Sequence, residues 1–249
     1  MATNKKIFSK ISLWWMDTDI FRKELSYSAT GKSIAILKTI IAIALVSDFD
    51  TRESEVSYSD LEEITGLSRP MVNISLKWLI EKKWLKLNSN SRGRTNVYEL
   101  IELDDDLSWT KLPYQPLIKN LKIISNRGPK SLTALKNYLM ILRYRPNKED
   151  VMRINHTTLI EKGNLRPNLV KSGNDLLLNA DLIGLGRCMT RTGQFNTSPN
   201  LYYVKGLYFG KKGVEQQSHV EEGALFSTIK TDRRIDEFST EFEDDLAPF

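Results

Sequence analysis

The chain has 249 residues and a formal net charge of +5, with 41% hydrophobic and 27% charged residues. These are ordinary globular values, so they exclude wholesale disorder and leave room for one or two domains. One cysteine (Cys188) and two histidines exclude an internal disulfide framework and a cysteine-based zinc site, so we expect no cofactor, no metal site and no catalytic residue.

The N-terminal segment, residues 1–29, is predicted to be an extension that docks on the first domain through Trp14 and Trp15. Its lysines are not followed by the apolar stretch of a signal peptide. The longest apolar run, residues 34–46, contains Lys38 and is too short to span a bilayer. We therefore expect a cytoplasmic protein with no membrane partner.

A first domain is predicted over residues 30–103. Apolar residues at helical spacing indicate a helix over about 32–47 and a short, serine-capped helix that begins near Ser57. A glycine turn at Gly66 leads to a third helix that begins at Ser68 and places its apolar face inward. Two strands follow, joined by a polar hairpin tip that carries two arginines.

An internal repeat predicts a second domain. The segment Lys32–Lys38 recurs as Lys130–Lys136, 98 residues later, and similar turn and strand segments follow both copies in the same order. This places the second copy over residues 128–210 and leaves 104–127 as a linker. The second copy departs from the first, because Asn164 replaces the turn glycine and Gly173 is expected to weaken the third helix.

The order helix, helix, turn, helix and basic hairpin resembles the winged helix-turn-helix family. The residues that carry the resemblance are the turn and helix start Leu61–Arg69, the helix end Trp78–Leu85 and the arginine-bearing hairpin. The resemblance implies an α+β, mainly helical fold with two tandem winged helix-turn-helix domains.

In such a fold the start of the third helix enters the DNA major groove, while the hairpin contacts phosphates or the minor groove. Arg69 and Asn73 have the donors and acceptors for guanine and adenine edges. The expected DNA-binding residues are Ser68, Arg69, Asn73, Lys77, Arg92 and Arg94 in the first copy, and Arg166, Asn168, Lys171, Asn174, Arg187 and Arg191 in the second. A solvated polar face or a dimerisation module is the alternative, chiefly for the second copy.

The charge is divided unevenly along the chain. Residues 214–249 hold ten acidic and three basic side chains, a net charge of −7, which leaves +12 on residues 1–213. A basic body favours a polyanionic partner such as double-stranded DNA. Residues 211–249 are accordingly expected to be a disordered acidic tail.

The end of that tail resembles the C-terminal tip of bacterial single-stranded DNA-binding proteins, with an alanine inserted. The residues expected to dock on a partner are Asp244, Asp245, Leu246, Pro248 and Phe249. The resemblance implies recruitment of host replication or repair proteins that bind such tips. The alternative is a tail that shields the basic faces of its own chain.

Together these features resemble plasmid or phage replication initiators, which hold repeated origin sequences and deliver melted DNA to the host helicase. Two alternatives remain open. One is a transcriptional repressor of a mobile element that binds a palindrome as a homodimer. The other is an adaptor or inhibitor that binds host repair proteins through its tail.

Overall fold

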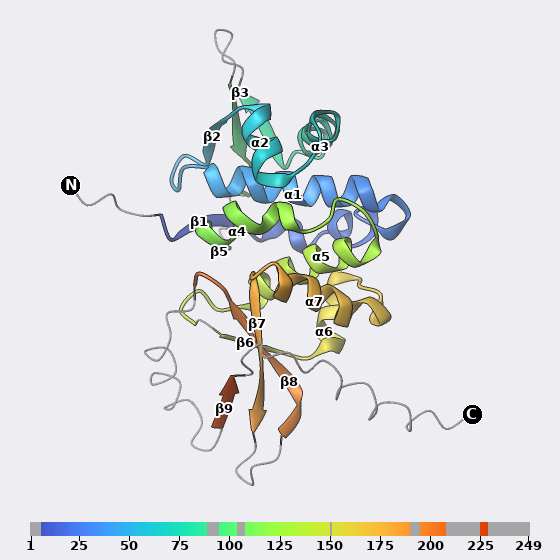
Figure 1. Cartoon of the computed structure of the whole chain (residues 1–249). Helices are drawn as coiled ribbons and strands as arrows, with labels where there is room; N and C mark the ends of the chain where they lie inside the picture. The colour runs from blue at the N-terminus through green and yellow to red at the C-terminus, as the bar shows by residue number, and fades with distance from the viewer. Residues whose placement is uncertain are drawn as a thin grey trace, which may run out of the picture.

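The computed structural model describes residues 6–88, 95–103, 108–149, 151–189, 195–207 and 225–228, without the side chains of 187–189, 195–199 and 225–228. The fold is α+β, with more helix than strand and with antiparallel strand pairing in each sheet described (Figure 1).

Each helix–strand unit is preceded by a segment that we call its lead-in. The first lead-in, residues 8–29, contains β1 (Phe8–Ser12) and the helical turns η1 (Trp14–Asp17), η2 (Ile20–Glu24) and η3 (Tyr27–Ala29). The first unit, residues 30–103, contains α1 (Thr30–Val46), β2 (Glu53–Val56), α2 (Tyr58–Thr65), α3 (Arg69–Glu81), β3 (Leu85–Asn88) and β4 (Asn96–Leu100). Its strands form one sheet in the order β2-β4-β3.

The second half of the chain follows the same order. The second lead-in, residues 109–127, contains β5 (Trp109–Pro113), α4 (Tyr114–Asn120) and η4 (Leu121–Ile123). The second unit, residues 128–207, contains α5 (Pro129–Tyr144), β6 (Val151–Ile154), α6 (His156–Gly163), η5 (Pro167–Leu169), α7 (Val170–Asn179), β7 (Ile183–Met189) and β8 (Phe195–Val204). Its sheet has the order β6-β8-β7-β9, with β9 (Leu225–Thr228) at the edge.

The helix α1 is apolar on every side and is buried from Ser33 to Leu45. The continuous helical segment Tyr27–Val46 is 20 residues long, so by length and composition it could cross a membrane, contrary to the expectation from the shorter apolar run. In the fold, however, 72% of its apolar window is buried inside the protein. Neighbouring elements therefore cover this helix as a core element.

Local signals set the entry to α3. Ser57 accepts a hydrogen bond from the Asp60 N–H, and the Asp60 side chain bonds back to the Ser57 N–H, which completes a capping box at the start of α2. The helix ends at Gly66, whose φ of +69° favours glycine. The sequence spacing predicts that Val72, Leu76, Leu79 and Ile80 form the inward face of α3. The first three are at most 2% exposed, as expected, whereas Ile80 is half-buried at the edge of the core.

The second unit makes the same turn with a different residue. Asn164 ends α6 in the left-handed conformation, at φ +48°, so asparagine takes the place of the glycine. Gly173, expected to weaken the third helix, instead allows α7 to approach α5. A Cβ atom at this position would lie 3.1 Å from Thr133 Cγ2 and 3.2 Å from the Ala134 nitrogen.

The two halves meet through an antiparallel ribbon of β1 and β5, in which Lys10 pairs with Lys111 at the centre. Their other contacts are reciprocal: η4 of the second lead-in packs on α2, η2 of the first lead-in packs on α6, and α1 packs on α5. An approximate twofold rotation therefore exchanges the halves. Figure 1 shows the result, with β3 and the β7–β8 hairpin at opposite ends of the molecule.

The lead-ins are part of the core, which corrects the assignment of a linker over 104–127 in its described part, residues 108–127. Leu112, Leu117, Leu121 and Ile124 are each at most 1% exposed and belong to one hydrophobic cluster with side chains of both units. The first lead-in docks on the first unit through Trp15, whose ring lies 4.7 Å from that of Trp84. It also reaches the second unit, because Arg143 on α5 pairs with Asp17. The core is thus continuous along the molecule.

Candidate nucleic-acid interface

The start of α3 presents polar side chains to solvent. Ser68, Arg69 and Lys77 are exposed, as the sequence predicts for a DNA-contacting face. The Arg69 side chain is 64% exposed, lies 3.7 Å from a Glu62 carboxylate oxygen and rests 5.1 Å from the centre of the Tyr58 ring. Exposed contacts of this kind contribute little to stability. The guanidinium is therefore free to exchange them for a base edge or a phosphate.

Asn73 lies one turn further along α3 and is half-buried. Its Oδ1 accepts a hydrogen bond of 3.3 Å from the Tyr58 hydroxyl, so its side chain is oriented by α2. Tyr58 thus contacts both Arg69 and Asn73. This orienting role of Tyr58 was not predicted, because it depends on the packing of α2 against α3.

The corresponding edge of the second unit exposes Arg166, Asn168 and Lys171. Arg166 lies 4.6 Å from the centre of the Tyr27 ring, and its backbone N–H donates to the Tyr27 hydroxyl at 3.3 Å. Tyr27 belongs to the first lead-in and lies 139 residues before Arg166 in the sequence. The first half of the chain therefore orients this arginine of the second unit.

Asn174 was predicted on the same face, and this prediction is wrong. The side chain is 4% exposed, accepts a hydrogen bond from Asn137 and bonds to the Tyr202 hydroxyl at 3.4 Å. The buried positions of α7 (Val170, Gly173, Asn174 and Leu177) are offset by 98 residues from Val72, Ser75, Leu76 and Leu79 of α3. Asn174 therefore occupies the core position that Leu76 has in α3. Because this residue is polar, the apolar spacing of the sequence does not mark the position as buried.

Several predicted site residues lie outside the part of the chain that the structure describes. Arg92, Arg94 and Arg191 belong to this group, as do the tail residues Asp244, Asp245, Leu246, Pro248 and Phe249. Of Arg187 only the backbone is described, within β7.

Among the described residues, the outward side of the first sheet carries three carboxylates and one cation, Lys86, which is ion-paired with Glu99. Glu53, Glu55 and Glu99 accept hydrogen bonds from Asn88, Thr95 and Lys86, respectively, at 2.9–3.0 Å. The bonds from Lys86 and Asn88 lower the pKa of Glu99. This sheet face is unsuited to a phosphate backbone, so the candidate surface is the helix edge.

Two buried lysines at equivalent repeat positions, Lys38 and Lys136, bind the backbone segments that lie behind the exposed starts of the third helices. The ammonium of Lys38 donates to the carbonyl oxygens of Thr65 and Ile124 and to Asn126 Oδ1, at 2.5–2.9 Å. Lys136 donates to the carbonyl oxygens of Arg22 and Leu25 at 3.2–3.3 Å. Each lysine thus holds the lead-in of the other half, and Lys38 also holds the last residue of α2. Burial lowers the pKa of both to about 8.

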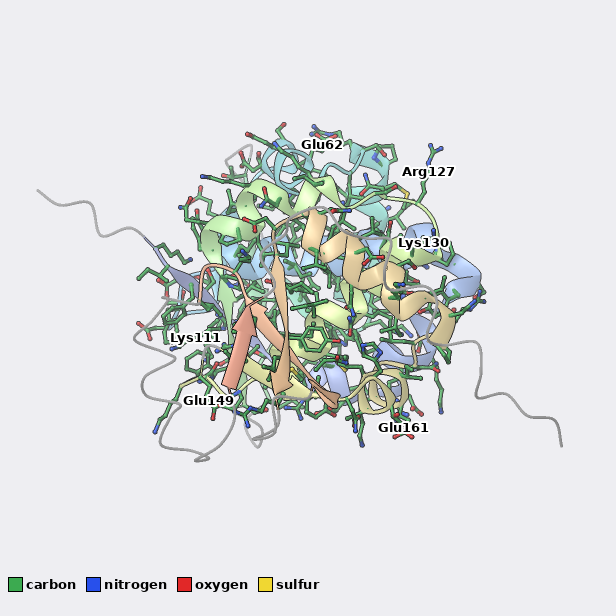
Figure 2. All side chains as sticks on the ribbon, turned by 60° about the horizontal axis from the view of Figure 1, so that its bottom comes forward. Glu62, Lys111, Arg127, Lys130, Glu149 and Glu161 are labelled. Carbon is green, nitrogen blue, oxygen red and sulfur yellow. The ribbon has the colours of Figure 1, made fainter. Side chains whose placement is uncertain are left out.

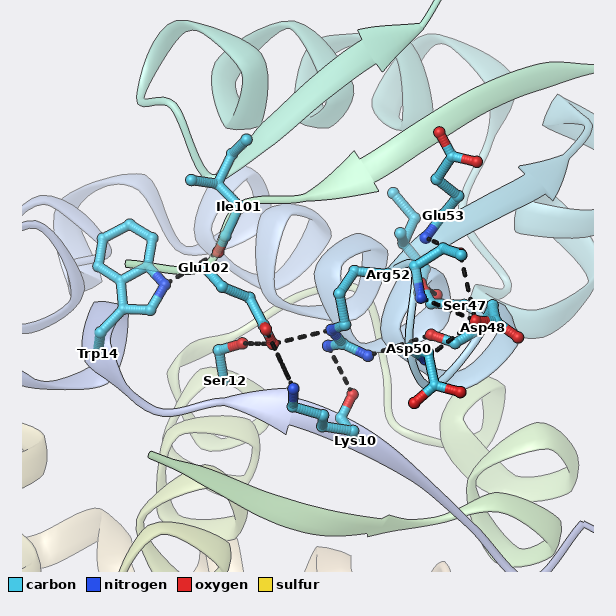
Figure 3. Close-up of polar contacts among 12 residues, drawn as sticks. Lys10, Ser12, Trp14, Ser47, Asp48, Asp50, Arg52, Glu53, Ile101 and Glu102 are labelled. Carbon is cyan, nitrogen blue, oxygen red and sulfur yellow. Dashed lines mark hydrogen bonds and ion pairs between the residues drawn. The ribbon is translucent and has the colours of Figure 1, made fainter. Parts of the chain in front are cut away.

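A second polar cluster, shown in Figure 3, is structural. Glu102 accepts from Ser12 at 3.0 Å and lies 2.9 Å from both Lys10 Nζ and Arg52 Nε. Although burial raises the pKa of Glu102, the Lys10 hydrogen bond and the Arg52 charge lower it below its usual value. The carboxylate is neutralised by two cations, so this cluster joins β1 to the end of the first unit.

Among the described residues, no group of three or more His, Cys, Asp or Glu side chains is arranged to hold a metal ion. Asp104–Asp106, a run of acids in the sequence, lies outside those residues. Comparison of the sequence with protein-family models gives no match, and a search among curated proteins gives none either.

Proposed function

We propose that each unit is a winged helix-turn-helix module and that the chain binds double-stranded DNA in a sequence-specific manner. The support is the order helix, strand, helix, helix, strand, strand, which occurs twice with the same strand pairing. In this module the third helix enters the major groove. The corresponding helices here are α3 and the η5–α7 segment.

One observation carries the proposal. Both units expose an arginine and further polar side chains at the start of the third helix, whereas the turn behind each start is fixed by the other half of the chain. Arg69 rests on the Tyr58 ring and makes one long ion pair, at 3.7 Å, with Glu62, while Arg166 rests on the Tyr27 ring. Preorganised backbone with loosely held arginines suits bidentate contacts to guanine.

The approximate twofold axis adds a geometric expectation. If the two third helices bind one duplex, the axis relates them by a twofold rotation, so a single chain would cover two half-sites of inverted orientation. The half-sites should differ in sequence, because the structural offset of 98 residues places Lys171 opposite Asn73 and Asp175 opposite Lys77.

Selection from a random duplex library at two salt concentrations tests the proposal. We expect one consensus with two unlike half-sites and an affinity that falls steeply with salt. Arg69→Ala should relax the preference at one or two adjacent base pairs, at a cost of about 1–3 kcal/mol. Lys148→Ala, an exposed control away from the helix edge, should preserve the consensus. Recovery of no consensus by the wild-type chain would refute sequence-specific binding.

We further propose the role of a plasmid or phage replication initiator, with the charge division of the sequence as support. The number of chains bound to each DNA site, measured from the mass of the protein–DNA complex, distinguishes this role from that of a repressor. One chain on each of several sites in tandem orientation supports an initiator, and two chains on an inverted pair support a repressor.

The acidic end of the chain is proposed to recruit host replication or repair proteins. Deletion of Pro248–Phe249 should abolish binding to a host protein that binds the tips of single-stranded DNA-binding proteins, and should leave duplex binding unchanged. A tip peptide should compete with the wild-type chain. Host-protein binding by a chain that binds no duplex would instead support the adaptor function.

A further inference from the structure

The second lead-in and α5 lie in an unusually basic part of the chain. Residues 107–148 contain nine lysines and arginines and no aspartate or glutamate. Lys136 and Arg145 are buried, and Arg143 pairs with Asp17. Lys122, Arg127 and Lys130 are exposed, and no salt bridge joins them to a described carboxylate.

Contacts at one end place this group beside the α3 start. The Lys122 Cβ lies 3.1 Å from where a Cβ of Gly66 would stand, and Asn126 donates to the Gly66 carbonyl oxygen at 2.6 Å. Gly66 is only two residues before Ser68. The segment 122–127 therefore borders the turn that delivers α3 to its exposed position.

Contacts at the other end lead to the second unit. Thr133, one helical turn after Lys130, bonds to the Tyr27 hydroxyl at 2.8 Å, and Tyr27 in turn contacts Arg166. The path from Gly66 to Arg166 thus passes Arg127 and Lys130. In Figure 2 these two residues lie on one side of the molecule, and Lys111 and Glu149 lie on the other.

We infer that Lys122, Arg127 and Lys130 form a phosphate-binding bridge that holds the DNA backbone between the two half-sites. This inference rests on the proposed function and adds to it a binding surface. Lys122 and Arg127 lie in the segment that the sequence assigned to a linker, and Lys130 lies at the start of the predicted second domain. Its ligand is the sugar–phosphate backbone, so it should increase affinity without changing base preference. Exposed cations without a carboxylate partner among the described residues suit this role, because no described ion pair has to be broken first.

The test compares the double variant Arg127→Ala/Lys130→Ala with Lys111→Ala/Lys148→Ala, which removes the same charge from the opposite side. Binding to the duplex selected above, and to an unrelated duplex, is measured from 50 to 200 mM salt. Each lost phosphate contact should reduce the slope of log K against log salt by about 0.9. The bridge variant loses two contacts, so the ratio of wild-type to variant affinity should be about tenfold smaller at 200 mM salt than at 50 mM salt.

We expect the control to keep the wild-type slope, and Arg127→Lys/Lys130→Arg to restore it. The selected consensus should be unchanged in all variants. A bridge variant whose slope equals that of the control overturns the inference and leaves the proposed function intact. A wild-type chain that selects no consensus, but whose slope on any duplex is reduced by the bridge variant, refutes sequence-specific binding and supports the bridge. A wild-type chain that binds no duplex refutes both.

Discussion

Asn174 and Asn168 lie two turns apart in the η5–α7 segment but belong to different environments. Asn168 is exposed beside Arg166, whereas Asn174 is buried and hydrogen-bonded to Asn137 and Tyr202. Removing one partner of a buried hydrogen bond leaves the others without a partner, which costs about 1–3 kcal/mol.

Asn174→Ala should therefore lower the free energy of unfolding by about 1–3 kcal/mol in urea titrations. Asn168→Ala should leave that free energy within about 0.5 kcal/mol of wild type, as is usual for an exposed position, and should weaken duplex binding. The reverse pattern, with a stable Asn174→Ala variant that binds DNA poorly, would return Asn174 to the DNA-contacting surface.

Gly173 shows how a residue that disfavours helix in isolation is required by packing. A side chain at this position meets Thr133 and the backbone of α5, whereas Gly31 in the first turn of α1 has open space around its Cβ position. Both are glycines within helices, so each serves as the control for the other.

We expect Gly173→Val to destabilise the protein by about 1–3 kcal/mol, the usual cost of overpacking a close contact. Gly31→Val should be neutral or slightly stabilising, because the substitution removes the flexibility of glycine from the unfolded chain. Thermal unfolding of the two variants measures the difference. Equal melting temperatures would show that α5 and α7 are not in close contact.

At the scale of elements, the buried lysines connect each unit to the lead-in of the other half. Their folded-state pKa of about 8 lies below the ordinary lysine value of 10.5. Between these two values the unfolded chain binds more protons than the folded one, so stability rises with pH in this window. Below pH 8 both states are protonated and the dependence disappears.

Lys38→Met removes both this titration and the hydrogen bonds to Thr65, Ile124 and Asn126. The variant should be less stable than wild type at pH 7, because these acceptors lose their donor. The stability gap should then widen from about pH 8 to 10.5, with a slope of at most about 1.4 kcal/mol per pH unit. Urea titrations at pH 7, 8.5 and 9.5 measure it, and Lys32→Met, at an exposed position of the same helix, is the control. A constant gap would exclude a lowered pKa of Lys38.

At the scale of the whole molecule, the hydrophobic cluster runs through both units and both lead-ins. Residues 128–210, predicted as a domain, lack the residues that bind Lys136, Thr133 and the Arg166 backbone, because Arg22, Leu25 and Tyr27 belong to the first lead-in. In a fragment of residues 128–210, the buried ammonium of Lys136 would therefore lack the Arg22 and Leu25 carbonyl oxygens as acceptors.

We therefore expect residues 6–207 to unfold in one transition that is the same by tryptophan fluorescence and far-UV circular dichroism. None of the five tryptophans lies in the second unit, residues 128–207, because Trp109 belongs to the second lead-in and the other four to the first half. Circular dichroism reports on both units, so coincidence of the two probes indicates that the units unfold together. The fragment 128–210 should be largely unfolded under the conditions in which residues 6–207 are folded. Two separate transitions, or a cooperatively folded fragment, would contradict a shared core.

Much of the local structure could be predicted from the sequence. The repeat at 98 residues, the Ser57 cap, the Gly66 turn and the inward face at Val72, Leu76 and Leu79 depend on neighbours within one or two helical turns. The exposed positions of Arg69, Lys77, Arg166 and Lys171 follow from the same spacing.

The tertiary structure alone decided how these pieces combine. A polar residue at a core position, a glycine required by a neighbouring helix and a charged group that binds backbone carbonyls all contradict simple hydrophobic patterning, because their partners lie far away in the sequence. Asn174 bonds to Asn137 and Tyr202, and Lys38 reaches Asn126, 88 residues away. Apolar spacing reports only whether a side chain is buried against something, whereas the partner is selected by shape and hydrogen bonding after the two halves have come together.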